Sequence, residues 1–143
     1  MLIKAAYFTQ SLRAKFSLPI NQNHVFFLKV FPPLKDFTKV KSGKDIRILI
    51  VDDVSENIQV AMNILKEESY TFSFATDGQE ALNLISNQAF DLILLDIMMP
   101  KVNGFDVCRA IKEMEHAKSI PVIFLTAKSD ADSINEGFEV GGV

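Results

Sequence analysis

One stretch, residues 90–104, constrains the fold of this chain more than any other. It reads F-D-L-I-L-L-D-I-M-M-P-K-V-N-G, and the four consecutive apolar residues at 92–95 are typical of a strand buried on both faces of a parallel sheet. The run ends at Asp96, and Asn103-Gly104 is a turn signal a few residues later. Asp96 therefore stands at the carboxyl end of a buried strand, where open α/β sheets bind ligands.

A second strand, rich in β-branched residues, also ends in acidic side chains. Residues 46–51 read I-R-I-L-I-V, and Asp52 and Asp53 follow directly. If the two strands are neighbours, the carboxylates of Asp52, Asp53 and Asp96 converge, and they repel one another unless a cation offsets their charge. A small set of oxygen ligands suits Mg²⁺, which keeps several of its waters. The pattern predicts a magnesium site at this edge of the sheet.

A third predicted strand, residues 120–125, ends in Thr126 and so brings a hydroxyl group to the same edge. Carboxylates, a metal ion and a hydroxyl donor together form a site suited to phosphoryl transfer, in which an aspartate accepts the phosphoryl group.

Helical patterns alternate with the predicted strands. Residues 55–68 carry apolar side chains at helical spacing, with Ser55 as the expected N-cap, and residues 70–75 form a short strand. A second helix follows Gly78, a third covers residues 105–115, and a fourth begins near residue 129. This alternation predicts an α/β fold with a parallel sheet and right-handed crossovers.

Residues 45–143 resemble the receiver domain of two-component response regulators. Four motifs in the same order carry the resemblance: V-D-D at 51–53, D-L-I-L-L-D-I-M-M-P at 91–100, N-G at 103–104 and F-L-T-A at 124–127. The resemblance implies a flavodoxin-like, doubly wound parallel sheet. Four βα units are predicted here, whereas the family has five.

The resemblance also implies a role for each residue of the site. Asp96 would accept a phosphoryl group from a phosphohistidine on a histidine kinase or phosphotransfer protein. Asp53 would bind Mg²⁺ directly, Asp52 mainly through water, and the backbone carbonyl of Met98 would be a further ligand beside Asp96. Thr126 would sense the phosphate.

The sequence departs from the family pattern at its C-terminal side. No fifth strand or helix is recognised, and the lysine that ends the fifth strand in the family is not found, because Lys128 lies in the loop after strand 120–125. The chain is therefore predicted to be a C-terminally truncated receiver. The exposed edge of strand 122–125 would pair with other chains. A missing downstream segment is the preferred explanation; a second copy, or the apolar segment 24–31, are alternatives that would cover the edge.

The first 44 residues have a different character from the rest. They hold eight Lys or Arg and one acid, a charge of +7, whereas residues 45–143 hold seven basic and seventeen acidic residues, a charge of −10. We expect residues 1–44 to be a basic, aromatic-rich extension outside the receiver fold. Charges and prolines interrupt its apolar runs, so neither a membrane span nor a secretory signal is predicted. An organelle-targeting presequence and single-stranded nucleic-acid binding are the less favoured interpretations of this segment.

The predicted function is that of a phosphoacceptor module in a cytoplasmic phosphorelay, not of an enzyme. The single Cys108 agrees with a reducing compartment. Two alternatives remain open. One is an inactive receiver fragment that acts only by binding. The other is a Mg²⁺-dependent phosphohydrolase with an aspartate nucleophile, but such enzymes typically place a second acid two residues after the nucleophile, where Met98 stands.

Overall fold

The computed structural model of the protein describes residues 29–31, 46–65 and 70–125. Predictions for Thr126, for Lys128 and for a helix beginning near residue 129 lie outside the described residues. Within them, the expected strands and helices occur in the expected order.

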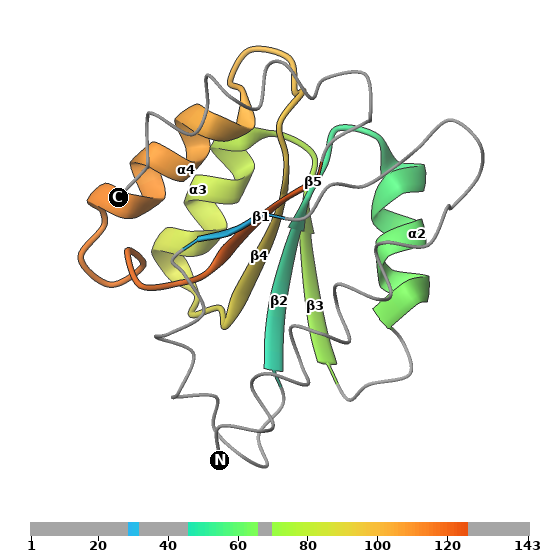
Figure 1. Ribbon diagram of the computed structural model, residues 1–143, viewed down its shortest axis with the longest axis horizontal. Coiled ribbons are helices and arrows are strands. Elements are labelled where there is room, and N and C mark those ends of the chain that lie inside the picture. The colour runs from blue at the N-terminus through green and yellow to red at the C-terminus, as the bar shows by residue number, and fades with distance from the viewer. Residues whose placement is uncertain (1–28, 32–45, 66–69, 126–143) are drawn as a thin grey trace.

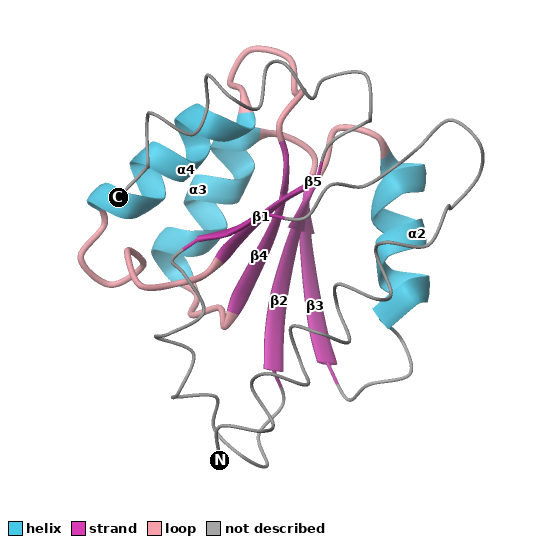
Figure 2. Ribbon diagram, viewed as in Figure 1, coloured by secondary structure: helices cyan, strands magenta, loops and turns pink. Residues whose placement is uncertain are grey.

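The described strands form one sheet (Figure 2). Its order is β1-β5-β4-β2-β3. The neighbours β5, β4, β2 and β3 are parallel, as the α/β pattern predicts, and β1 runs antiparallel along β5. The strands are β1 Lys29–Phe31, β2 Ile46–Val51, β3 Tyr70–Ala75, β4 Leu92–Asp96 and β5 Val122–Leu125.

Helices cover the two faces of the sheet (Figure 1). They are α2 Ser55–Leu65, α3 Gly78–Asn87 and α4 Gly104–Glu113. The apolar side chains of α2 pack with one face of the sheet, whereas α3 and α4 pack with the other. This arrangement confirms the doubly wound fold.

The central strand β4 contributes to both cores. Leu92 and Leu94 belong to the cluster under α2, and Ile93 and Leu95 belong to the cluster under α3 and α4. All four side chains are 0–1% exposed. Burying each of them stabilises the fold by roughly 1.5–3 kcal/mol. This is why the chain shows an unbroken apolar run at 92–95 instead of an alternating pattern.

The strand β1 comes from the segment expected to lie outside the receiver fold. In the register of its pairing, Lys29 lies opposite Phe124, Val30 opposite Ile123 and Phe31 opposite Val122. This pairing agrees with the alternative in which the apolar segment 24–31 covers the edge of the sheet. The division into an extension over 1–44 and a receiver domain over 45–143 stays a prediction.

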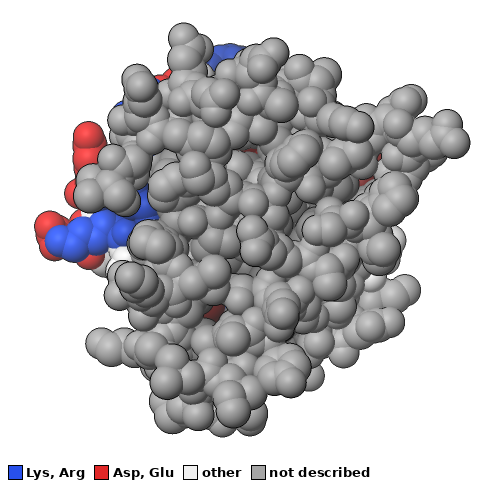
Figure 3. Space-filling model, viewed as in Figure 1, with Lys and Arg blue, Asp and Glu red and all other residues white. Residues whose placement is uncertain are grey.

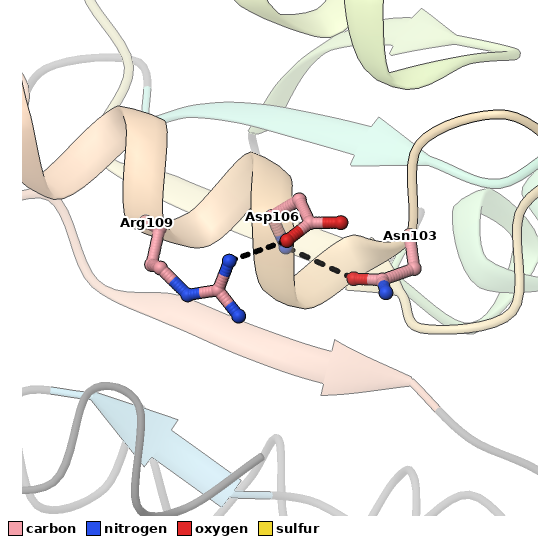
Figure 4. Close-up of polar contacts among 3 residues, drawn as sticks. All are labelled: Asn103, Asp106 and Arg109. Atoms are coloured by element: carbon pink, nitrogen blue, oxygen red, sulfur yellow. Dashed lines mark hydrogen bonds and ion pairs between the residues drawn. The ribbon is translucent and has the colours of Figure 1, made fainter.

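Side-chain caps fix where two helices begin. The Asp77 carboxylate accepts a hydrogen bond from the Glu80 backbone N–H at the start of α3. At the start of α4, the Asn103 side-chain oxygen accepts one from the Asp106 N–H, and Arg109 pairs with the Asp106 carboxylate (Figure 4). Each cap satisfies a donor that the helix itself leaves without a partner.

Charged side chains of both signs lie beside one another at the left of Figure 3, the side on which Figure 1 places α4. The pairs Asp106–Arg109 and Glu115–Lys118 belong to α4 and the turn after it. None of the helices that the structure describes is long and apolar enough to span a membrane.

Candidate functional site

Three carboxylates meet at the carboxyl edge of the sheet. Strands β2 and β4 are parallel neighbours with Val51 opposite Leu95, so the residues that follow them emerge at the same edge. Asp52, Asp53 and Asp96 each offer a carboxylate oxygen, and these oxygens lie within 4.8 Å of one another. The convergence that the sequence predicts for these three residues is present.

Asp52 is held firmly in the folded structure. It is 2% exposed, and it is the only polar or charged residue in the described part of the chain that is counted as buried. One of its carboxylate oxygens accepts hydrogen bonds from the Val54 N–H at 2.9 Å and from the Asn57 side-chain amide at 3.2 Å. Its own N–H donates to the Ala75 carbonyl at 3.1 Å. These contacts fix one acid of the cluster in place.

Asp53 is exposed, whereas Asp96 is partly buried at the end of β4. Burial, as the largest cause, together with the negative charges of Asp52 and Asp53, raises the pKa of Asp96 from 3.8 to about 6. Hydrogen bonds with the backbone of Met98 and Ile97 act in the opposite direction. The charged form of Asp96 is therefore disfavoured until a positive charge joins the cluster.

The loop after Asp96 folds back against the end of β4. The Gly104 N–H donates to the Ile97 carbonyl at 2.9 Å, and Ile97 in turn donates to the Leu125 carbonyl at 3.3 Å. A Cβ atom at Gly104 would lie 2.2 Å from the backbone oxygen of Asp96. Only glycine therefore fits here without moving the backbone that carries Asp96. Lys101 lies at the turn of this loop with a positive φ of 72°.

The remaining predicted site residues are Met98 and Thr126. Met98 is 60% exposed. The role of its backbone carbonyl as a ligand stays a prediction. Thr126 follows Leu125 directly in the chain, but it lies outside the described residues.

The residues at this edge fit a hard divalent cation. Among the described residues, the side-chain donors of this cluster are three carboxylates, and three negative charges within a few ångströms need an opposite charge to be stable together. Few protein ligands and access to water on the side of Asp53 suit Mg²⁺ better than ions that prefer nitrogen or sulfur.

Sequence reasoning missed two residues that support the site. Asn57 donates to Asp52 from the first turn of α2. A polar residue five positions after an acid at a strand end is a sequence signal that could have identified Asn57 as a partner of that acid. Gly104 was interpreted only as part of a turn, because its close approach to Asp96 depends on how the loop folds back.

Comparisons with known proteins agree with this geometry. Residues 48–143 match the family described as the response regulator receiver domain. A probable cyclic di-GMP phosphodiesterase of Vibrio cholerae is 37% identical over 136 residues, covering 93% of this chain and 31% of that protein. The response regulator PleD of Caulobacter vibrioides is 40% identical over 95 residues, covering 66% of this chain and 21% of that protein. The chain thus spans a third or less of these two relatives.

The similarity to the Vibrio protein is longer than the receiver match. An alignment that covers 93% of the chain includes residues 29–31, and so reaches the segment that forms β1.

Solved structures share the fold. The chemotaxis protein CheY4 of Vibrio cholerae aligns with a TM-score of 0.62 and 31% identity, covering 68% of this chain and 82% of that one. The sheet order, the acids at the strand ends and the family match point to one conclusion. The chain belongs to the response regulator receiver domain family, the phosphoacceptor modules of two-component signalling systems.

Proposed function

We propose that this chain accepts a phosphoryl group on Asp96, from a phosphohistidine on a kinase or phosphotransfer protein. The observation that carries the proposal is the meeting of three carboxylates from the ends of β2 and β4 within 4.8 Å. Asp96 is the acceptor because it ends the central strand and is partly buried, whereas Asp52 is engaged by Val54 and Asn57.

The reaction is a transfer between two nucleophiles. An Asp96 carboxylate oxygen attacks phosphorus, the nitrogen–phosphorus bond of the phosphohistidine breaks, and the imidazole leaves with the bonding electron pair. The product is an acyl phosphate, which water later hydrolyses to inorganic phosphate and free carboxylate. The residues of the site position the groups and balance charge, and little else is required of them.

Mg²⁺ would be held by Asp52, Asp53 and Asp96, with the Met98 carbonyl as a further ligand, and would neutralise the charge of the cluster and the phosphoryl oxygens. The chain's own contribution is to place these acids together. Asn57 and Val54 orient Asp52, and Gly104 allows the loop to close on Asp96. Thr126 is proposed to sense the phosphate.

The test is the intact mass of the chain after incubation with Mg²⁺ and acetyl phosphate. The wild type should gain one phosphate. Asp96→Asn should gain none, since it removes the attacking oxygen while keeping the size of the side chain. Asp91→Asn, which changes an exposed acid at the other end of β4, should behave like the wild type. A folded wild type that gains no phosphate would favour the alternative of an inactive receiver that acts only by binding.

The phosphohydrolase alternative is the less supported one. The position two residues after Asp96 is occupied by the exposed Met98, so no second acid stands there for general acid–base catalysis. We therefore propose that the output is a change of conformation and partner binding, not a released product. A cytoplasmic location, a further domain downstream and a homodimer stay predictions.

A further inference from the structure

The outer edge of β5 is paired with a strand from the N-terminal side of the chain. Among the described strands, β1 alone runs antiparallel to its neighbour, and it lies next to β5 and no other strand. A sheet edge exposes backbone donors and acceptors that readily pair with an added strand. The edge of β5 thus acts as a strand-binding site, with residues 29–31 in it.

The strand β5 also touches the site on its other side. Leu125 lies opposite Asp96 in the β4–β5 pairing, and its carbonyl accepts from the Ile97 N–H at 3.3 Å. The Phe124 ring packs against the Phe105 ring at a centroid distance of 5.1 Å, and Phe105 belongs to the first turn of α4. A change in how rigidly β5 is held would therefore affect both ends of the loop that follows Asp96.

The pairing of β1 is short. It involves three residues on each strand, compared with six in the pairing of β2 and β3. Fourteen residues, 32–45, separate β1 from β2. When extended they reach about 46 Å, well above the roughly 14 Å of three strand spacings between β1 and β2. The tether therefore permits both the paired and the released state.

Charge favours the paired state. Residues 1–44 carry a net charge of +7 and residues 45–143 a net charge of −10, so the segment that contains β1 is attracted to the domain it pairs with. This attraction is of long range and weakens as salt screens it.

We propose that β1 is a displaceable strand whose pairing with β5 is coupled to cation binding at Asp52, Asp53 and Asp96. The inference rests on the proposed function, because the cation site belongs to it. With β1 in place, β5 has a neighbour on both sides and its end holds Ile97 and the backbone of Asp96 in register. With β1 released, that end has more freedom, and assembling the three carboxylates around a cation costs more conformational entropy. The coupling is reciprocal, so a bound cation strengthens the pairing of β1.

The test compares the full wild-type chain with Lys29→Pro and Val30→Pro. In an antiparallel pair, alternate residues direct their N–H groups toward the partner strand, and proline removes that donor. One of the two prolines must therefore remove a β1–β5 hydrogen bond. Val30→Thr, which keeps the N–H and the β-branched side chain, is the matched control.

Two quantities are measured for each variant: the hydrogen exchange of the β5 backbone and the affinity for Mg²⁺ alone by titration calorimetry. At least one proline variant should exchange faster in β5 and bind Mg²⁺ at least about fivefold more weakly, whereas Val30→Thr should match the wild type. In the reverse direction, Mg²⁺ should slow the exchange of β5 in the wild type and clearly less in Asp96→Asn.

Three results would overturn the proposal. Unchanged β5 exchange in both proline variants would mean that β1 does not pair in solution. Faster exchange with unchanged Mg²⁺ affinity would mean that pairing and cation binding are independent. A wild type that binds no Mg²⁺ would contradict the proposed function as well. This result does not depend on the β1 variants, so it can be distinguished from a failure of the coupling alone. If a proline variant does not fold, the effect of Mg²⁺ on wild-type exchange decides.

Discussion

Asp96 is the residue whose surroundings set how the site responds to pH. Its folded pKa of about 6 lies above the ordinary value of 3.8, with burial as the larger cause and the charge of Asp52 as the next. A raised carboxyl pKa means that the folded protein holds a proton that the unfolded chain has already released. Stability from this group is therefore present at low pH and is lost as the pH rises from about 4 to about 6.

Replacing Asp96 by Asn should remove this dependence. In EDTA at pH 7, we expect Asp96→Asn to be more stable than the wild type by about 1–2 kcal/mol, after allowance for solvent screening of a partly exposed group. At pH 3.5 the difference should have nearly vanished, because Asp96 is then neutral in the folded state and mostly neutral in the unfolded state of the wild type. Urea unfolding from pH 3.5 to 7.5 checks this. A difference between the two proteins that stays constant with pH would contradict the raised pKa.

Gly104 is a second residue with a specific consequence. In Gly104→Ala, the new methyl group meets backbone atoms of Asp96 and Ile97 at 2.2–3.0 Å, which cannot give way without moving the site. We expect a loss of at least about 2 kcal/mol of stability and weaker Mg²⁺ binding. Gly78→Ala is the control, since its nearest contact is a side-chain methyl of Val107 at 2.7 Å. Equal losses for the two variants, by chemical unfolding, would contradict this reasoning.

At the scale of elements, the start of α4 depends on its cap more than on its ion pair. Asn103→Ala removes the acceptor for the Asp106 N–H and should cost about 1 kcal/mol, whereas Asn103→Asp should be tolerated. Arg109→Ala breaks only an exposed pair and should cost less than about 0.5 kcal/mol. Thermal or urea unfolding distinguishes the two. A larger loss of stability for Arg109→Ala than for Asn103→Ala would mean that the ion pair, and not the cap, matters more for the start of α4.

The elements that the sequence predicts well are those with a repeating signal. The run at 92–95 and the strand at 46–51 are apolar because both faces of the sheet are covered, and the acids that follow them mark the site. The strand β3 and the helices α3 and α4 also agree with their patterns to within a residue or two.

The features that the sequence does not predict depend on contacts that no local sequence pattern encodes. A three-residue strand such as β1 is too short for periodicity, and its partner lies far along the chain. The helix α2 begins at Ser55, the first residue of the expected range, and the Val54 carbonyl accepts hydrogen bonds from the Asn57 and Ile58 N–H groups, so Val54 and not Ser55 stands at the cap position. The Val54 N–H itself donates to the Asp52 carboxylate, a contact that depends on where Asp52 lies at the end of β2.

At the scale of the whole molecule, cation binding and folding are linked. The cluster forms only when β2 and β4 are paired, so Mg²⁺ binds the folded state and not the unfolded chain. At a concentration a hundred times the dissociation constant, Mg²⁺ should stabilise the protein by about 2.7 kcal/mol. Thermal melts with MgCl₂, compared with KCl of equal ionic strength, check this. Asp96→Asn should show a clearly smaller rise in melting temperature, and an equal rise would place the ion elsewhere.

The position of β1 in the chain also determines the order in which the described strands can pair during synthesis. Lys29 pairs with Phe124, ninety-five residues later in the chain. At about 5–20 residues per second, the ribosome needs roughly 5–19 s to make the intervening chain. Throughout that interval, the segment that becomes β1 has been synthesised while its partner does not yet exist. The pairing of β2 with β3, made from residues close in sequence, can form early, and β1 must join last. Of the described strands, β1 is thus the first to be translated and the last to pair.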